Sequence, residues 1–299
     1  MDLLSELLDF AAWKNDLLLQ ITCYEKWGYH FPCEKSGGFH IVTQGICYLR
    51  YSEQVVRLER GDVIFIMKGI HHDLVSTPKE KTVSAQALEE KLLTSTSTKI
   101  EPITSLVSVR YEVPDRPQHP FFLELPEVIL VQSSEIPIGH PIYTTIEMIS
   151  KEIKSGFGSS LITQRLTDIL LYHVIRRWLE LNKSTKAGWL KAFKDEKILY
   201  ALEFIHRDLV FNWTIEVLAQ SIGLSRASLA ARFKNSLGLT VMQYITQFRL
   251  MKGRFLAENS DLSLEGISQQ VGYSSAFAYS KAYKRVYGYS PRNPKVHSK

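Results

Sequence analysis

The chain has 299 residues, of which 45% are hydrophobic, 22% charged and 11% aromatic. This composition is that of an ordinary globular protein, and it excludes a disordered or collagen-like chain. At about 100–200 residues per domain, the length predicts two domains. The net charge of +5 is divided unevenly, because residues 1–185 carry 19 basic and 23 acidic side chains and residues 186–299 carry 17 basic and 8 acidic. The basic part alone therefore suggests an anionic partner, nucleic acid or a membrane surface.

Several classes of protein are excluded by what the sequence lacks. Its acidic start, Met1–Glu6, is unlike a signal or transit peptide. No apolar run approaches the ~18 residues that a membrane span needs. Cys23, Cys33 and Cys47 form no CxxC pair, so we expect reduced thiols in a cytoplasmic protein. Because no GxSxG, HExxH or GxxxxGK[ST] motif occurs, we expect neither an enzyme nor a cofactor.

Short apolar segments separated by glycines predict strands in the first part of the chain. Several short strands in succession are typical of an antiparallel sandwich or barrel. The candidate strands are 40–43, 46–51, 54–57, 62–67, 106–112 and 128–132.

Three histidines in this region are weak candidates for a ligand pocket: His40, His71 and His72. Side chains alternate across a strand, so at most one of the adjacent pair can face the interior. A metal-dependent enzyme would need several His and Glu side chains that converge on one point. No His-x-His followed by glutamate is present, so we expect no metal. The rival hypothesis is a metal-dependent enzyme fused to a nucleic-acid-binding domain.

The middle of the chain changes from irregular to helical. Residues 81–104 are rich in Ser and Thr without a clear period, which predicts an exposed loop. From 142 to 181 apolar residues recur every three to four positions, which predicts helices. Their apolar stripe is too wide for a lone surface helix, so we expect it to pack either on the sheet or on another subunit, the latter being the hypothesis of a homodimer. The polar stretch 182–186 then precedes the basic part.

An internal repeat occupies the basic part. Residues 214–225, TIEVLAQSIGLS, align without a gap with residues 263–274, SLEGISQQVGYS. Self-similarity of this length predicts two copies of one supersecondary unit. The identical pairs are Glu216 and Glu265, Gln220 and Gln269, Gly223 and Gly272, and Ser225 and Ser274.

Each copy has the pattern of a helix, a tight turn and a second helix, which is the helix-turn-helix signature. A hydroxyl side chain can cap the first helix, a glycine favours its left-handed end, and a serine can cap the second helix. In order, these residues are Thr214, Gly223 and Ser225 in the first copy and Ser263, Gly272 and Ser274 in the second.

The second helices are predicted over 226–237 and 275–287, with small and cationic side chains outward. A helix that enters the major groove of DNA needs small residues for close approach and cations or hydroxyls for phosphates and bases. Between the copies, 241–259 has helical spacing and would span ~28 Å. Successive major-groove faces lie ~34 Å apart, so this connector could set the two helices in adjacent grooves. Gly253 within it predicts close helix packing.

Over residues 195–294 the sequence resembles the DNA-binding domain of AraC/XylS-type transcriptional regulators. The likeness is carried by WTIEVLA (213–219), GLSRASLAARFKNSLG (223–238), Arg249-Leu250 and VGYSSAFAYSKAYKRVYGYSP (271–291). Two departures are Ala231, where arginine is usual, and Gly253, where alanine is usual. From the pattern and the resemblance together, the candidate DNA-binding residues are Ser225, Arg226, Ala227, Ala230, Ala231, Arg232, Lys234, Ser274, Ser275, Ala276, Phe277, Ser280, Lys281 and Lys284.

The N-terminal part resembles the cupin-type sensor domain of one branch of this family. GFHIVTQGICYLR (38–50), LERGDVIFIMKGIHHDLV (58–75) and HPFFLELPEVILV (119–131) carry that likeness, which implies a pocket rather than catalysis. We therefore predict an α+β protein with two domains. Residues 1–185 would form a cupin-like β-barrel with following helices, for ligand binding and dimerisation, and residues 186–299 an all-α domain with two helix-turn-helix motifs.

The predicted function is sequence-specific regulation of transcription. Double-stranded DNA is the expected partner, and the resemblance adds a small-molecule effector, a second copy of the chain and RNA polymerase. An RNA-binding or purely structural module would fit the basic charge but not the duplicated turn units.

Overall fold

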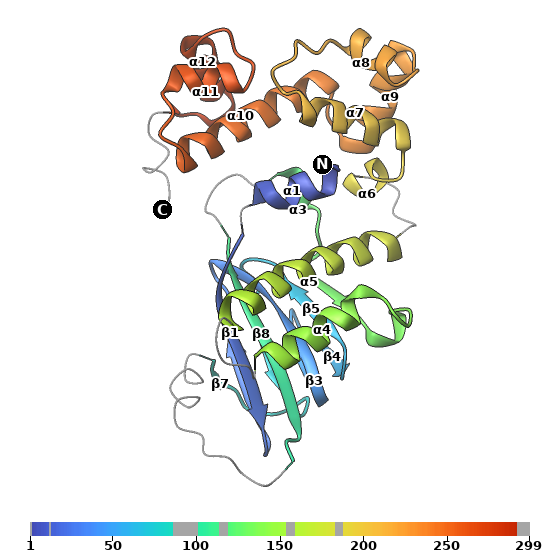
Figure 1. Ribbon diagram of the computed structural model, residues 1–299, viewed down its shortest axis with the longest axis vertical. Helices are drawn as coiled ribbons and strands as arrows, with labels where there is room; N and C mark the ends of the chain where they lie inside the picture. Colours follow the sequence, from blue (N-terminus) through green and yellow to red (C-terminus); the bar gives the residue numbers. More distant parts are fainter. Residues whose placement is uncertain are drawn as a thin grey trace. The chain divides into compact units, whose positions relative to one another are not determined.

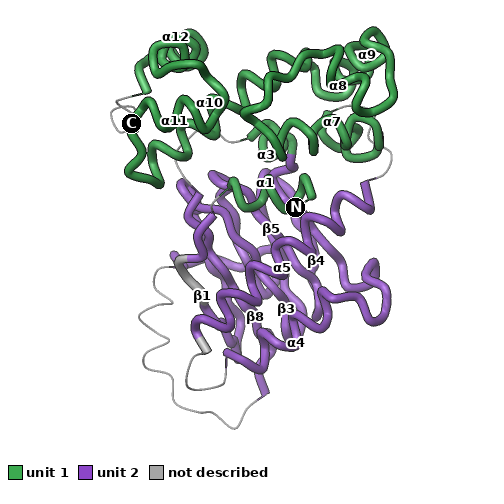
Figure 2. The backbone as a smooth tube through the Cα atoms, turned by 45° about the horizontal axis from the view of Figure 1, so that its top comes forward, with its two compact units in different colours: residues 1–11, 115–124, 183–299 green, residues 12–114, 125–182 purple. Residues whose placement is uncertain are grey.

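The computed structural model describes residues 2–11, 13–85, 101–113, 119–153, 159–182 and 188–291 (Figure 1). The chain divides into two compact units (Figure 2). Unit 1 comprises Met1–Ala11, Asp115–Glu124 and Lys183–Lys299, and unit 2 comprises Ala12–Pro114 and Leu125–Asn182. Each unit is thus assembled from separate stretches of chain. The Ser/Thr-rich run 93–98 and the predicted boundary at Lys186 lie outside the described residues.

Unit 2 contains a curled sheet that, in the described residues, has nine strands. All its strand pairs are antiparallel except β2 with β7, and the sheet folds over on itself as the cupin-like prediction requires. The strands are β1 (Lys14–Cys23), β2 (Gly28–Phe31), β3 (Ser36–Tyr51), β4 (Gln54–Glu59), β5 (Val63–Ile66), β6 (His72–Val75), β7 (Val83–Ser84), β8 (Thr104–Glu112) and β9 (Val128–Val131).

One long strand, β3, replaces the two strands predicted at 40–43 and 46–51. Its first half pairs with β8 and β5, and its second half pairs with β4 and β6. The pairing with β8 shifts register between Val42 and Gln44, and Gly45 has a φ of +76°. A β-carbon on Gly45 would lie 1.9 Å from the carbonyl oxygen of Ile103, so only glycine allows this bend. The glycine therefore bends one strand rather than separating two.

The interior of the folded sheet is apolar. Some strands are buried on both faces, such as β5 with all four residues buried, which is why they read as continuous apolar runs in the sequence. This core comprises Ile21, Cys23, Trp27, Val42, Cys47, Leu49, Leu58, Ile64, Ile66, Leu74, Ala85 and Leu106.

Two helices complete unit 2, as the spacing over 142–181 predicts. Helix α4 (Pro141–Glu152) begins after His140, whose side chain accepts a hydrogen bond from the backbone N–H of Ile142. Helix α5 (Ser159–Leu181) packs on α4 and on strands β1, β5 and β9 (Figure 1). Within the described ranges, no helix has the length and apolar character that crossing a membrane requires.

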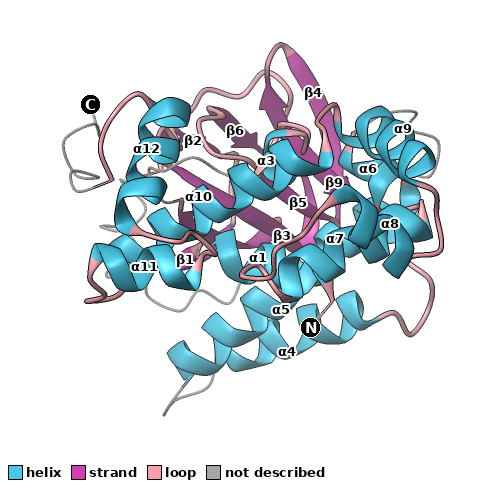
Figure 3. Ribbon diagram, turned by 90° about the horizontal axis from the view of Figure 1, so that it is seen from above, coloured by secondary structure: helices cyan, strands magenta, loops and turns pink. Residues whose placement is uncertain are grey.

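Unit 1 is helical in its described residues. Helix α10 (Val241–Asn259) is the longest, and it joins a pair formed by α11 and α12 to a group formed by α7, α8 and α9 (Figure 3). The other helices are α1 (Leu3–Ala11), α3 (Pro120–Leu123), α6 (Trp189–Ala192), α7 (Glu196–Arg207), α8 (Ile215–Ser221), α9 (Arg226–Leu237), α11 (Leu264–Gln270) and α12 (Ala276–Tyr287).

Candidate nucleic-acid interface and ligand pocket

The two predicted helix-turn-helix units are present as α8–α9 and α11–α12. Thr214 caps α8 by accepting a hydrogen bond from the N–H of Val217, and Ser263 caps α11 in the same way from Gly266. The turn glycines have φ of +67° at Gly223 and +78° at Gly272. The predicted caps of the first helix of each unit and the glycine turns are therefore confirmed.

The start of the last helix corrects one prediction. Ser225 caps α9, as expected, by accepting from the N–H of Ser228 at 3.2 Å. In the second copy the cap is Ser275, which accepts from the N–H of Ala278, and not Ser274. The second copy has one more residue in its turn, so the gap-free alignment placed the cap one position too early.

The faces of α9 and α12 divide as predicted. Leu229, Phe233, Tyr279 and Tyr283 are buried. The side chains expected to point outward are exposed in both helices: Arg226, Ala227, Ala231, Arg232, Lys234, Phe277, Lys281, Lys284 and Arg285. Ala230, Ser275, Ala276 and Ser280 are partly exposed and Ser274 is exposed, so every candidate DNA-binding residue lies at the surface of unit 1.

Arg249 in α10 joins the loop before the first helix-turn-helix unit to the turn of the second unit, a role that its motif alone did not indicate. Its Nε and Nη2 donate to the carbonyl oxygens of Leu209 and Phe211, at 2.9 and 2.8 Å. Its Nη1 donates to the carbonyl of Gly272 at 3.1 Å, in the turn of the second unit. The planar guanidinium thus fixes the loop after α7 against the turn before α12. Distance in sequence hides such a contact from pattern analysis.

Gly253 lies where α10 passes α12. A β-carbon there would lie 2.5 Å from Oη and 2.8 Å from Cε2 of Tyr279, a residue that is fully buried. The close packing predicted from this glycine is confirmed, and the tyrosine on α12 is its cause.

A buried polar chain links the N-terminal helix of unit 1 to α7 and α10. His119 Nδ1 accepts from the N–H of Phe121, so the proton of a neutral ring lies on Nε2, which is 3.1 Å from Tyr244 Oη. The Tyr244 hydroxyl then donates to His206 Nε2 at 2.5 Å, and His206 Nδ1 faces Glu6 Oε2 at 3.3 Å. Burial lowers the pKa of both histidines, which keeps the rings neutral.

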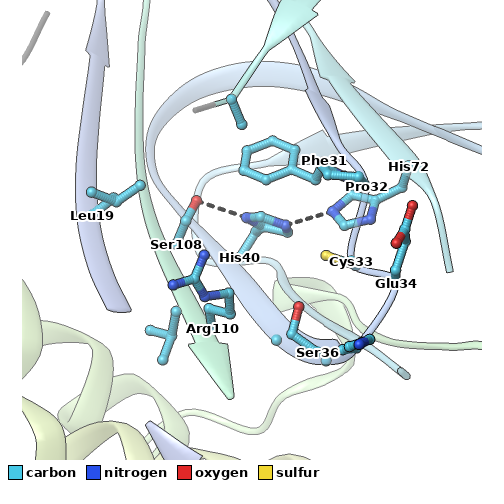
Figure 4. A pocket seen from close by; sticks show the side chains of 15 residues that line it. Leu19, Phe31, Pro32, Cys33, Glu34, Ser36, His40, His72, Ser108 and Arg110 are labelled. Carbon is cyan, nitrogen blue, oxygen red and sulfur yellow. Dashed lines mark hydrogen bonds between the residues drawn. The ribbon is translucent and has the colours of Figure 1, made fainter. Parts of the chain in front are cut away.

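Unit 2 contains a cavity of about 360 Å³ at the turn between β2 and β3 (Figure 4). His40 and His72 form one wall, with their Nε2 atoms 2.8 Å apart. The ring of Phe31 stacks on His72 with its centroid 5.1 Å away. Other lining residues are Leu19, Cys33, Glu34, Lys35, Ala85, Ser108 and Arg110.

The hydrogen bonds of the two pocket histidines have a fixed direction. His72 Nδ1 must donate, because its partner at 3.1 Å is the carbonyl of Ile70. Its Nε2 then accepts from His40, and His40 Nδ1 accepts from the hydroxyl of Ser108 at 2.7 Å. Burial is the main cause that lowers the pKa of His72 to about 4, and burial together with His72 keeps the pKa of His40 far below its ordinary value. Both rings are therefore neutral, and all four nitrogens have partners.

The structure brings His40 and His72 together but leaves His71 outside this cavity. His71 is exposed, in agreement with the alternation expected of adjacent residues. A catalytic zinc site keeps three protein ligands. Across the described ranges, no three His, Cys, Asp or Glu side chains are grouped so that they could hold a metal ion. The two histidines at this cavity are fewer than the three protein ligands of such a site.

Fold and surface together define a class: a two-domain DNA-binding regulator with a cupin domain. The family model described as "Cupin" matches residues 2–180, and the model described as "Helix-turn-helix domain" matches residues 218–294. The chain belongs to the AraC/XylS family of transcription regulators with a cupin-type N-terminal domain.

Relatives match along almost the whole chain. A protein of Streptomyces antibioticus named as an AraC-like transcription regulator is 28% identical over 99% of both chains. The HTH-type transcriptional regulator MtrA of Neisseria gonorrhoeae is 25% identical over 97% of both. Among solved structures, ToxT of Vibrio cholerae aligns with 93% of this chain and 95% of its own, at 12% identity and a TM-score of 0.37.

Proposed function

We propose that the protein binds a specific duplex site through α9 and α12 and thereby regulates transcription in the cytoplasm, without catalysing a reaction. One observation carries this proposal: a single helix, α10, supports two helix-turn-helix units whose second helices expose small and cationic side chains. The small residues allow close approach to the groove, and the cations compensate phosphate charge. RNA polymerase is a further proposed partner.

The test is an electrophoretic shift of the DNA upstream of the gene with the full-length protein at two salt concentrations. Affinity should fall as salt rises, because binding to phosphates releases counterions. Lys281→Ala in α12 should cost about 1–3 kcal/mol if this lysine contacts a base. Lys151→Ala, which removes an exposed lysine from α4 in unit 2, is the matched control. Absent or salt-insensitive binding would contradict the proposal.

The cavity beside His40 and His72 is the proposed effector site. Its lining combines apolar side chains with charged ones and the neutral histidine pair, which suits a small molecule with an apolar body and a polar group. Ala85→Phe would fill the cavity from the residue that follows β7, and Val83→Phe would place the same ring at an exposed position of β7. Only the first variant should abolish regulation of a reporter promoter by its effector. An unchanged response would place the effector elsewhere.

Self-association through α5 is the proposed dimer contact. The helix exposes large apolar side chains on the face away from the sheet, among them Leu161, Ile162, Ile169 and Tyr172. Ile169→Glu should shift the protein towards monomer in sedimentation. Val55→Glu, at a comparably exposed apolar position on β4, should not. A monomer at every concentration in the unmodified protein would reject the dimer.

A further inference from the structure

Resting on the proposed function, we propose that the two recognition helices read DNA unequally. Helix α12 makes the base-specific contacts, to thymine and guanine, whereas α9 is anchored on phosphates by its cations and presents alanine methyl groups to the base edges. The proposal follows from the chemistry that the two helices place on corresponding faces.

Three alanines line the exposed face of α9 in its first two turns. Ala227 and Ala231 are exposed and Ala230 is partly exposed. A methyl group neither donates nor accepts a hydrogen bond, so it cannot distinguish guanine, cytosine or adenine by their groove edges. The only base feature it can contact favourably is the methyl group of thymine. Helix α9 therefore allows close approach but carries little sequence information.

Two of the three cations of α9 are directed to its flanks, and the third, Lys234, lies in the last turn, away from the N-terminal residues with which such a helix contacts base edges. Arg226 Nη1 lies 3.1 Å from Glu216 Oε1, in α8, and Arg232 Nη1 lies 3.5 Å from Asp195 Oδ1, at the start of α7. Both carboxylates belong to neighbouring elements, so they draw the guanidinium groups away from the middle of the alanine face. These exposed ion pairs are weak and can be exchanged for phosphate contacts. Because phosphates border the major groove, cations at the flanks of α9 can reach phosphates rather than base edges.

Helix α12 presents three kinds of base-reading group. Phe277, in its first turn, is 77% exposed and offers an apolar ring to thymine methyl groups. Ser280 offers a hydroxyl and Lys281 an ammonium that can donate to guanine O6 and N7. Among the described residues, no carboxylate forms a salt bridge with Lys281. Its ammonium is therefore available to a base.

A repeated glutamate shows how the two copies differ. Glu216 in the first copy holds the side chain of Arg226. Its counterpart Glu265 instead accepts from the backbone N–H of Ala276 at 3.0 Å, at the first residue of α12. The repeated glutamate thus orients the phosphate-binding side chain of Arg226 in the first copy. In the second copy it fixes the start of α12.

The experiment selects duplexes from a random pool with the full-length protein. One half-site should be defined by a few base pairs that include thymine, and the other should tolerate most sequences. Replacing the selected thymine by deoxyuridine removes only its methyl group and should weaken binding about 3- to 10-fold. The Phe277→Ala variant should bind the thymine-containing duplex more weakly by the same factor. Replacing thymine by deoxyuridine should not weaken its binding further.

A second pair of variants assigns the other half-site to α9. Ala231→Arg adds donors to the alanine face and should create a new base preference there, whereas Arg207→Ala, at an exposed cation of α7, should change neither half-site. If the unmodified protein selects equally strong base preferences in both half-sites, the proposal that α9 and α12 read DNA unequally is wrong. A Phe277→Ala variant that keeps the preference for thymine would also contradict it. Failure to select any DNA would instead refute the proposed function itself, so the two failures are distinct.

Discussion

Arg249 shows how one side chain can set the geometry of an interface that it does not itself present. Its three hydrogen bonds reach carbonyls in the loop after α7 and in the turn before α12. Arg249→Ala should reduce the stability of unit 1 by about 1.5–3 kcal/mol or more, because hydrogen bonds from a charged donor are lost and three carbonyls are left without it. Urea denaturation followed by tryptophan fluorescence measures this change.

The same variant should weaken specific DNA binding more than nonspecific binding, because the turn of the second unit is no longer held against the loop before the first unit. Arg249→Lys keeps the charge but not the planar fork, so it should restore only part of the affinity. Full restoration by lysine would show that charge rather than geometry matters at this position.

At the scale of elements, the packing of α10 on α12 depends on a matched pair, Gly253 and Tyr279. Gly253→Ala should destabilise unit 1 by about 1–3 kcal/mol through overpacking, although alanine is the better helix former. Gly266→Ala in α11 is the matched control, because the nearest atom to its new β-carbon is Ser263 Oγ at an ordinary 3.5 Å. Thermal unfolding compares the two.

The double variant Gly253→Ala with Tyr279→Leu tests the cause. If the tyrosine ring is what excludes a β-carbon, the two substitutions together should cost less than the sum of their separate effects. If the destabilisation of the double variant equals the sum of the two single effects, the tyrosine is not what excludes a β-carbon at Gly253.

Elements with strong local signals were predictable from the sequence. The helices at 226–237 and 241–259 have the predicted bounds, because caps, glycines and spacing all favour the same ends. Helix α1 and strands β1, β2 and β6 were not predicted, although β1 pairs along its whole length with β8. Short segments of mixed polarity become strands through partners far away in sequence, and no local pattern records such partners.

The sequence predicts which residues belong to the candidate sites better than it predicts which of them lie close together. The identities and exposure of the residues on α9 and α12 follow from helical spacing. The facing nitrogens of His40 and His72 do not, because 32 residues separate them in sequence. Nor could the pattern show that Glu6 and His119 belong to the same unit as the DNA-binding helices.

At the scale of the whole molecule, four buried neutral histidines, His40, His72, His119 and His206, make stability depend on pH. Burial lowers the pKa of each below the ordinary value of 6.5. The unfolded chain therefore binds protons near that pH while the folded chain does not, so stability is greatest above it and falls as the solution is acidified.

This loss should show as a lower urea midpoint at a pH of about 5.5 than at about 7.5, with a slope of up to roughly 1.4 kcal/mol per pH unit for each histidine. His72→Gln should reduce the pH dependence, whereas His71→Gln, at an exposed position, should leave it unchanged. A midpoint that rises on acidification would contradict the buried neutral rings.

The most direct test of the central claim is the affinity of the full-length protein for its selected duplex and for a scrambled duplex, measured across a range of salt concentrations. We predict that both affinities fall with salt, by at least about 10-fold between 50 and 200 mM, and that the selected duplex stays the tighter ligand throughout. Equal affinity for the two duplexes, or an affinity that does not change with salt, would contradict a sequence-specific DNA-binding regulator.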